Sequence, residues 1–246
     1  MDDQLASNAK YLRLTNLLGR WDHYLAMAQK GNCSPVHLVR TILADEAETR
    51  RANARAQRLK RALIPEPWVM ETFPFGEQPK LDKKRVLTLY DSFEYIQKHE
   101  DIIWIGPTGC GKTGLGTSFL VQAIQRGHKG RYVLFPKLVG ELFSSVADHS
   151  EEKVIKRYLA YECLLVDEVG YVEMEAVQVG LFFTLMQRRH KKRSTLITSN
   201  LGFRQWRSFL KNDHLTAALI DRLTETSHVF NMRNCVSLRQ KLEETP

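Results

Sequence analysis

The chain has 246 residues, of which 43% are hydrophobic and 26% are charged, and its formal net charge is +8. The composition is that of an ordinary globular protein, and the apolar runs are too short to cross a bilayer, so we expect a cytoplasmic protein without a membrane partner. The four cysteines lie far apart and form no C-x-x-C pair, which argues against a zinc site and fits free thiols. The basic balance favours a polyanionic partner.

Residues 1 to about 63 have the apolar spacing of helices. Gly31-Asn32 is expected to end the first helix, and Ser34-Pro35 to begin the second as N-cap and first-turn proline. The second helix continues into residues 50–61, which hold six basic residues and no acidic one. Such a segment is either a solvated helix face or a contact for DNA phosphates, and both interpretations stay open. The candidate DNA-binding residues here are Arg50, Arg51, Arg55 and Arg58.

The prolines at 65 and 67 end this basic helix. We therefore predict an all-helical N-terminal domain over residues 1–66, a linker over 67–80 and a larger α/β domain over 81–246. Within the linker, Phe73 and Phe75 either pack beside a bound adenine or attach the linker to the domain core.

A helix over about 82–98 and a strand over 101–105 are predicted to precede the sequence Gly106-Pro-Thr-Gly-Cys-Gly-Lys112-Thr113, which a further helix follows. A strand, a G-x-x-x-x-G-K-[ST] loop and a helix form a cradle of backbone N–H groups for the phosphates of a nucleotide. We expect positive φ at Gly109 and Gly111, Lys112 on the β- and γ-phosphates, and the Thr113 hydroxyl on Mg²⁺. The predicted nucleotide-binding residues are Gly106, Pro107, Thr108, Gly109, Cys110, Gly111, Lys112, Thr113 and Gly114.

A strand over 131–135 and helices over about 137–147 and 150–161 follow. The second of these helices adds Lys153, Lys156 and Arg157 to the candidate DNA-binding residues. An apolar strand over 163–168 then ends in two carboxylates, Asp167 and Glu168. Asp167 is placed to orient Mg²⁺, and Glu168 is placed to polarise the attacking water.

A helix over about 175–190 ends in a third basic segment, residues 188–193, which is also a candidate DNA surface. The next strand, 194–199, delivers Asn200 to the sheet edge where the phosphate loop and Asp167 lie, because parallel sheets bind ligands at the carboxyl ends of their strands. Its amide is suited to bind the attacking water or the γ-phosphate. Helices over about 203–211 and 214–227 follow, and then a short tail that contains Val229-Phe230.

Four sequence segments together carry a family resemblance. Gly106–Thr113, Leu165-Val-Asp167-Glu168, Thr198-Ser-Asn200 and Asp221-Arg222-Leu223 resemble the Walker A, Walker B, sensor 1 and arginine-finger motifs of AAA+ ATPases. Their order and spacing are most similar to the DnaC/IstB branch. The segment Glu168-Val-Gly-Tyr171, the Thr-Ser-Asn strand end and the basic helical N-terminus point to the IstB family within that branch.

The resemblance covers essentially the whole chain and implies an α/β fold. This fold is a P-loop NTPase AAA+ core, a parallel sheet flanked by helices, with a small all-α N-terminal domain. Only about fifteen residues follow Asn231, so the C-terminal lid is expected to be truncated or absent. Whether Arg233 or Arg239 replaces the sensor 2 arginine of a full lid stays open.

The resemblance also implies the cofactors ATP and Mg²⁺ and the catalytic residues Lys112, Asp167, Glu168, Asn200 and Arg222. Arg222 is expected to act in trans, in the site of an adjacent subunit of a homo-oligomer; the alternative is a surface salt bridge with Asp221 or Glu225. The predicted function is an ATP-dependent DNA-binding regulator of transposition. It self-assembles on duplex target DNA, recruits its cognate transposase and is released or remodelled by hydrolysis. The alternatives are a DnaC-like replicative helicase loader and a P-loop kinase for small molecules.

Overall fold

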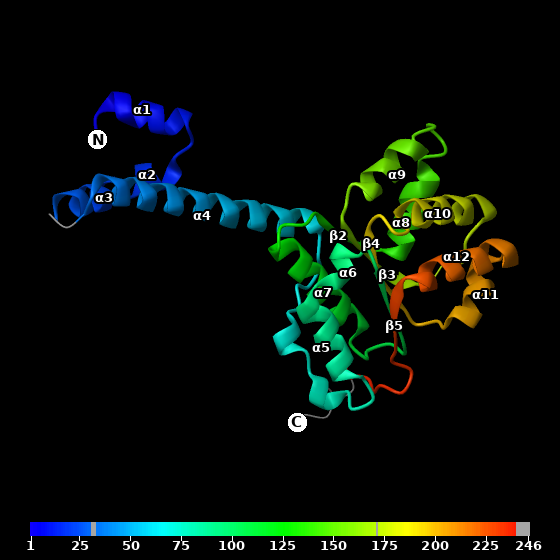
Figure 1. The fold of residues 1–246 in the computed structure, drawn as a ribbon. Helices are drawn as coiled ribbons and strands as arrows, with labels where there is room; N and C mark the ends of the chain where they lie inside the picture. The colour runs from blue at the N-terminus through cyan, green and yellow to red at the C-terminus, as the bar shows by residue number, and fades with distance from the viewer. Residues whose placement is uncertain (31–32, 171, 240–246) are drawn as a thin grey trace. The chain divides into compact units, whose positions relative to one another are not determined.

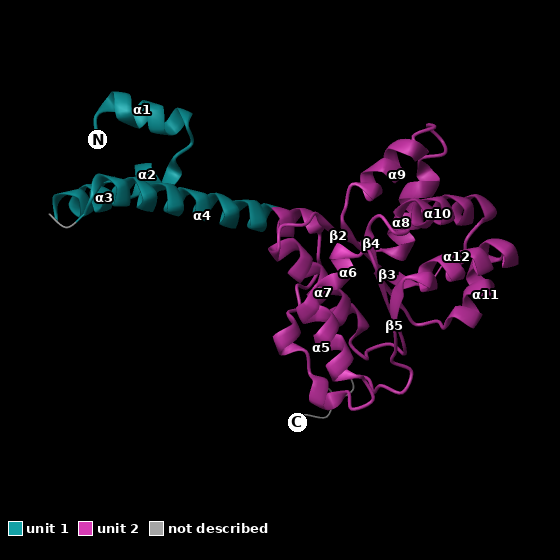
Figure 2. Ribbon diagram, viewed as in Figure 1, with its two compact units in different colours: residues 1–57 teal, residues 58–246 magenta. Residues whose placement is uncertain are grey.

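The computed structural model describes residues 1–30, 33–170 and 172–239. The predicted helix break at Gly31-Asn32 and the family-specific Tyr171 therefore lie outside the described residues. The chain divides into two compact units, Met1–Gln57 and Arg58–Pro246 (Figure 2). The division falls inside a helix, whereas the sequence places its domain boundaries at residues 66 and 80, and these boundaries stay a prediction.

The first unit is helical, as predicted. It contains α1 (Asp3–Tyr11), α2 (Thr15–Gly19), α3 (Trp21–Gln29) and most of α4 (Pro35–Ala62) (Figure 1). The prediction of one helix before Gly31 is wrong, since Arg13 takes a left-handed φ of 56° and separates α1 from α2. The predicted start of α4 is confirmed, because the Ser34 hydroxyl accepts a hydrogen bond from the His37 N–H at 3.2 Å.

Polar side chains of α4 hold the short helices of this unit. Asp45 accepts hydrogen bonds from Arg20 at 2.7 Å and from the Tyr24 hydroxyl at 2.6 Å. Glu46 is buried and accepts the Leu17 N–H, in the first turn of α2, at 2.8 Å. The carboxylate thereby satisfies one of the backbone donors that every helix start leaves unpaired.

The second unit is built on a five-stranded sheet in the order β2-β3-β4-β1-β5, with every neighbouring pair parallel. The strands are β1 (Asp101–Ile105), β2 (Gly130–Leu134), β3 (Cys163–Val169), β4 (Ser194–Ser199) and β5 (Ser227–Asn231). The four predicted strands are confirmed. The fifth, an edge strand beside β1, was not predicted, because three of its five residues are polar and leave only Val229-Phe230 as an apolar signal.

Helices cover both faces of the sheet (Figure 1). One face packs against α5 (Lys83–Ser92), α6 (Glu94–Gln97) and α7 (Lys112–Gln125), and the other against α8 (Phe135–Ser144), α9 (Glu151–Leu159), α10 (Ala176–Arg189), α11 (Trp206–Leu210) and α12 (Asp213–Glu225). Alternate residues of β1 feed the two cores: Ile102 and Trp104 pack with α7, whereas Ile103 and Ile105 pack with α10. The predicted parallel sheet between helices is confirmed.

Two connections differ from the predicted elements. The single helix expected over 82–98 is wrong, because Phe93 takes a φ of 58° between α5 and α6. The helix expected over 203–211 is the short turn η3 (Phe203–Gln205) followed by α11, which ends where Lys211 takes a φ of 49°.

The segment before α5 contains the turns η1 (Met70–Thr72) and η2 (Phe75–Glu77). Phe73 is buried, and Phe75 is partly buried against the same core cluster. The two rings lie edge to face at 4.8 Å, so these aromatic residues attach the segment to the core of the second unit.

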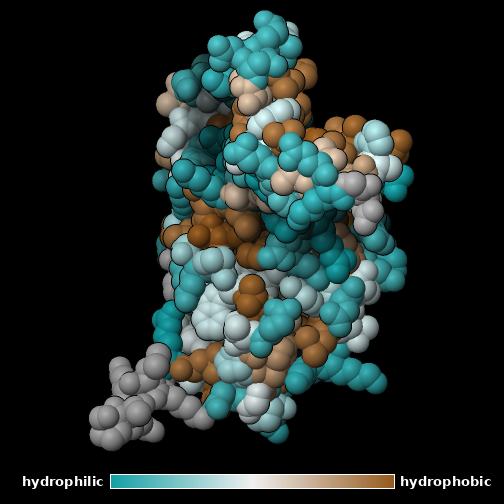
Figure 3. Space-filling model, turned by 90° about the vertical axis from the view of Figure 1, so that its left-hand side faces the viewer, coloured by the Kyte–Doolittle hydropathy of each residue, from teal (hydrophilic) through white to brown (hydrophobic). Residues whose placement is uncertain are grey.

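The surface is predominantly hydrophilic on the face that Figure 3 draws, where hydrophobic residues form separate patches. Within the described residues, no helix combines the length and the apolar character that crossing a membrane requires. After β5, the described residues Met232–Arg239 form no helix, and the truncated or absent lid stays a prediction.

Candidate active site

The phosphate loop connects β1 to the first residue of α7, Lys112. Gly109 and Gly111 have φ values of 82° and 94°, which confirms the positive φ predicted for both. At Gly106 an added Cβ would lie 2.8 Å from the backbone of Met232, so the loop approaches another segment too closely for a side chain. The loop and the amino end of α7 together form the anion-binding geometry that the motif predicts.

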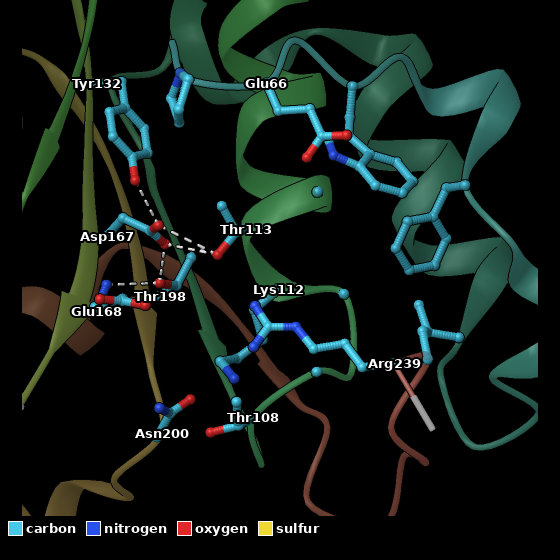
Figure 4. Close-up of a pocket in the computed structure, with 17 residues that line it drawn as sticks. Glu66, Thr108, Lys112, Thr113, Tyr132, Asp167, Glu168, Thr198, Asn200 and Arg239 are labelled. Atoms are coloured by element: carbon cyan, nitrogen blue, oxygen red, sulfur yellow. Dashed lines mark hydrogen bonds between the residues drawn. The ribbon is translucent and has the colours of Figure 1, made fainter. Parts of the chain in front are cut away.

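A cavity of about 700 Å³ lies against this loop (Figure 4). Predicted site residues that line it are Thr108, Gly109, Gly111, Lys112, Thr113, Gly114, Asp167, Glu168 and Asn200. Gly106, Pro107 and Cys110 belong to the loop but do not line the cavity, and Cys110 is fully buried. The carboxyl ends of β1, β3 and β4 therefore converge on one cavity, as the parallel topology requires.

Lys112 is held within the loop. Its side chain is only 7% exposed, and Nζ donates to the carbonyl oxygens of Gly106 and Pro107 at 2.8 and 2.7 Å. Burial lowers the pKa of the ammonium group, while the nearby carboxylates of Asp167 and Glu168 oppose that shift. Lys112 thus places a positive charge at the phosphate loop.

The Asp167 carboxylate is surrounded by hydroxyl donors. It accepts hydrogen bonds from Thr113 at 3.0 Å, from Tyr132 at 2.9 Å and from Thr198. Burial and, next, the charge of Asp167 raise the pKa of Tyr132, so the phenol keeps its proton and stays a donor. Asp167 itself is 2% exposed. Three hydroxyls from three different elements fix its orientation (Figure 4).

Glu168 has an unusual backbone conformation. Its φ is 64°, and the pairing of β3 with β4 shifts register between Val166 and Val169. The Glu168 N–H donates to the Thr198 hydroxyl at 3.0 Å, which holds this irregularity in place. Non-glycine residues at positive φ cost energy and concentrate at functional sites. The bulge leaves the Glu168 side chain exposed at the cavity, next to the buried Asp167.

Arg222 lies away from the cavity of its own chain. It is on α12, does not line the cavity, and holds its guanidinium 6.0 Å from the centre of the Phe183 ring. The described residues include no ion pair between Arg222 and Asp221 or Glu225; Glu225 instead pairs with His190 and Lys191. The structure therefore brings together Lys112, Thr113, Asp167, Glu168 and Asn200, but not Arg222.

The cavity also contains residues that were not among the predicted site residues. Tyr132 and Thr198 orient Asp167, while Trp68 and Arg239 line the part near α7 and the C-terminal segment. The Trp68 ring lies 3.4 Å from the position of a Cβ at Gly114. Thr198 belongs to a quoted motif, and Arg239 is one of the two arginines for which a sensor 2 role was left open. Tyr132 and Trp68 lie outside the motifs, so motif spacing does not indicate them.

The residues present suit a magnesium ion bound together with a nucleotide. The Thr113 hydroxyl and the Asp167 carboxylate lie 3.0 Å apart and offer hard oxygen ligands. Within the described residues, no three histidine, cysteine or acidic side chains cluster as a metal site. Mg²⁺ takes one or two protein ligands and completes its coordination with phosphate oxygens and water, so Thr113 and Asp167 would hold it once a nucleotide is bound.

Comparison with known sequences gives a consistent picture. A family model described as IstB-like ATP binding protein matches residues 7–245. A protein named as an ATP-binding protein of insertion sequence IS21 from Pseudomonas aeruginosa is 29% identical over 90% of this chain and 83% of its own length. A similarly named IS5376 protein from Geobacillus stearothermophilus is 27% identical over 98% of this chain and 96% of its own length.

Solved structures with a similar fold include a helicase loader and a replication initiator. The DnaC helicase loader matches with a TM-score of 0.53 at 19% identity, over 61% of this chain and 90% of its own. DnaA from Aquifex aeolicus, bound to AMPPCP, matches with a TM-score of 0.58 at 17% identity, over 74% of this chain and 57% of its own. The predicted P-loop AAA+ core is thereby confirmed.

Proposed function

The chain belongs to the family of IstB-like ATP-binding proteins, and on that premise we propose that it is an ATPase that assembles on duplex DNA to regulate transposition. The assembly recruits the cognate transposase, and ATP hydrolysis releases or remodels it. The observation that carries this proposal is the convergence of Lys112, Thr113, Asp167, Glu168 and Asn200 on one cavity. Phosphate, metal and water ligands converge in this way in P-loop ATPases.

Each residue of the cavity has a chemical role in this proposal. The loop N–H groups and Lys112 bind the β- and γ-phosphates, and Thr113 and Asp167 hold Mg²⁺, which offsets the phosphate charge when bound. Asn200 orients the attacking water. Glu168 accepts a proton from that water as its oxygen attacks the γ-phosphorus, and the bond from this phosphorus to the bridging oxygen of ADP breaks.

The base of ATP occupies the part of the cavity lined by Trp68 and Phe73. In a P-loop protein the phosphates run from the loop along the first turn of the following helix, and here that turn passes Trp68 at Gly114. An adenine ring is an apolar aromatic surface that stacks favourably on such side chains. Phe73 thus both attaches its segment to the core and faces the nucleotide.

Arg222 acts on the nucleotide of a neighbouring subunit. Its side chain is half-buried, lies outside its own cavity, and has no acidic partner among the described residues. A guanidinium from a neighbour stabilises the charge of the transition state only after assembly, so hydrolysis is coupled to oligomer formation.

Light scattering with and without duplex DNA tests assembly. We expect particles much larger than the 28.4 kDa chain with ATP and DNA together, and a smaller species with ADP.

Arg222→Ala is expected to bind ATP normally, but its rate of ATP hydrolysis is expected to fall by about 100-fold or more, because a trans arginine contributes about 10³- to 10⁵-fold. Arg207→Ala, in α11, is the matched control.

Mixing two inactive variants tests whether Arg222 of one subunit acts on the nucleotide of its neighbour. Lys112→Ala retains the arginine but loses its own nucleotide site, and Arg222→Ala retains the site, so mixed assemblies are expected to recover part of the ATPase rate. A protein that stays monomeric under every condition, with an ATPase rate that DNA does not change, contradicts the proposal and favours a small-molecule kinase.

The basic side chains differ in how free they are to contact DNA. Arg50 donates to the carbonyl oxygens of Leu12 and Arg13, and Arg58 is half-buried. In the second unit, Lys156 pairs with Glu152, Arg157 with Glu141, and Arg188 with Glu152, and Arg189 is fully buried. Arg51, Arg55, Lys60, Lys153 and Lys192 are exposed, and within the described residues none of them forms an ion pair. Arg51 and Arg55 lie one helical turn apart on α4, so both can contact one phosphate backbone. We infer that these two arginines are the principal phosphate contacts.

The salt dependence of DNA affinity tests this assignment. The logarithm of the DNA association constant falls linearly with the logarithm of the salt concentration, by roughly 0.9 for each phosphate contact. The double variant Arg51→Ala/Arg55→Ala removes two contacts, so the magnitude of this slope is expected to decrease by about 2. Lys156→Ala/Arg157→Ala removes the same charge from ion-paired positions and is expected to change the slope much less. The reverse order of effects would move the DNA surface to α9.

A helicase loader of the same fold remains the alternative function. The match to the IstB-like family model includes nearly all of the N-terminal unit, whereas the match to the DnaC structure covers 61% of this chain. Binding of the full-length protein to a hexameric replicative helicase, without affinity for duplex DNA, is the result that would favour the loader.

A further inference from the structure

The C-terminal strap, defined here as Met232–Arg239, lies along the phosphate loop. The Leu238 N–H donates to the Gly109 carbonyl at 2.9 Å, and the Met232 N–H donates to the Ile105 carbonyl at 2.6 Å. A Cβ at Gly109 would overlap the Ser237 hydroxyl, and one at Gly106 would meet Met232. The strap is therefore in direct contact with the backbone that binds the phosphates.

Gln78 connects the strap to the loop. It is only 1% exposed, and its side-chain nitrogen donates to the carbonyls of Val236 at 2.7 Å and Cys110 at 3.3 Å. Its side-chain oxygen accepts the Val236 N–H at 3.1 Å. One buried amide thus bonds both to the strap and to the phosphate loop. Because the loss of such a group leaves buried donors and acceptors unpaired, Gln78 holds the strap in position.

At the end of the strap, Arg239 lines the same cavity as Lys112. Figure 4 shows its side chain extending from the strap into the cavity toward Lys112. Within the described residues, Arg239 forms no ion pair, whereas Lys112 donates to carbonyls of its own loop. Arg233, on the same strap, has its guanidinium against Gly202 and does not line the cavity.

We propose that Arg239 binds the phosphates of the nucleotide in its own subunit, and that the strap and Gln78 hold it in place for this contact. This inference rests on the proposed function, since it takes the cavity to be the nucleotide site. A guanidinium is always charged and its planar donors match phosphate oxygens, so a phosphate chain is the ligand it suits. Preorganisation by the strap reduces the ordering cost of binding.

Equilibrium binding of ATP, ADP and adenosine to the full-length protein tests the proposal. Arg239→Ala is expected to weaken ATP and ADP binding by about 10- to 100-fold, the usual loss for one charge-assisted hydrogen bond, and to leave adenosine binding unchanged. Arg239→Lys keeps the charge and is expected to retain part of the affinity. The matched control Arg233→Ala is expected to bind ATP within about twofold of the parent.

The variant Gln78→Ala measures the contribution of the strap to ATP binding separately from that of the Arg239 side chain. It is expected to weaken ATP binding in the same direction, and the double variant Gln78→Ala/Arg239→Ala is expected to lose no more than Arg239→Ala alone, because both act through one contact. Thermal unfolding without nucleotide shows that the variants are folded. The charge-neutral, similarly sized Arg239→Gln provides a second test if Arg239→Ala unfolds.

Two results would contradict the role of Arg239 while leaving the assignment of the cavity as the nucleotide site intact. These are an ATP affinity of Arg239→Ala and Arg239→Gln within about twofold of the parent, and an equal loss for ATP and adenosine. In both cases Lys112→Ala still abolishes ATP binding. If Lys112→Ala binds ATP as the parent does, the proposed function itself fails, so the two failures are distinguishable.

Discussion

Glu168→Gln is expected to stop ATP turnover while the protein still binds ATP and assembles on DNA. The amide keeps the size of the side chain but cannot accept a proton from water, and loss of a general base costs about 10²- to 10⁴-fold in rate. Asp167, Thr113 and Lys112 are unchanged, so nucleotide affinity is retained. Phosphate release measured at saturating ATP, together with an ATP-binding isotherm, gives both quantities.

The control for this variant is Glu173→Gln, an equally small change at an exposed carboxylate that pairs with Lys211 outside the cavity. It is expected to hydrolyse ATP at the parental rate. Parental turnover in Glu168→Gln would reject Glu168 as the base. Trapping of Glu168→Gln in large ATP-dependent assemblies on DNA would agree with hydrolysis as the releasing step.

Lys112→Ala is expected to lose nucleotide binding itself, by at least about 100-fold. The ammonium is nearly buried at the phosphate loop, where a positive charge interacts with phosphates far more strongly than in water. Thermal unfolding measures this loss. Because a ligand that binds only the folded state stabilises it, ATP is expected to raise the melting temperature of the parent but not of Lys112→Ala.

Lys137→Ala removes an exposed lysine of α8 and serves as the matched control, with a parental response to ATP. Melting of Lys112→Ala without nucleotide is also informative. If that variant unfolds at much lower temperature, its loss of binding reflects a damaged loop, and Lys112→Arg or Lys112→Met then separates the charge from the fold. An ATP-induced shift equal to that of the parent contradicts the assignment.

The proposed catalytic site is composite. One chain supplies the phosphate loop, Asp167, Glu168 and Asn200 around a single cavity, and its own Arg222 lies elsewhere. The proposed neighbour completes the site with its Arg222, and the strap adds Arg239 from the same chain. Hydrolysis then depends on the state of assembly, whereas nucleotide affinity depends on contacts within one chain. Arg222→Ala and Arg239→Ala are therefore expected to affect different steps.

Much of the cavity was predictable because its residues follow strands of a parallel sheet. The site residues follow β1 and β4 directly or lie among the last residues of β3, and parallel strands place these carboxyl ends at one edge. The positive φ of Gly109 and Gly111 was predictable from the loop motif for a similar reason. Local sequence determines such features, since a few adjacent residues contain all the information.

Other features escaped prediction because their cause is not local. The edge strand β5 is mostly polar and forms because β1 offers it a hydrogen-bonding partner. The helix breaks at Arg13 and Phe93 rest on left-handed residues that are not glycine. Glu168 was expected to end its strand, but β3 continues to Val169 through a register shift that the Thr198 hydroxyl stabilises.

The sequence alone thus determined the family, the P-loop core, the helical N-terminal region and the residues of the phosphate loop. Only the tertiary structure decided which other side chains line or support the cavity: Tyr132 on Asp167, Trp68 beside α7, and Arg239 in place of Arg233. The strap meets the loop across more than a hundred residues of sequence, through backbone hydrogen bonds and one buried glutamine. Such contacts depend on packing between distant segments, and neither periodicity nor motif spacing records them.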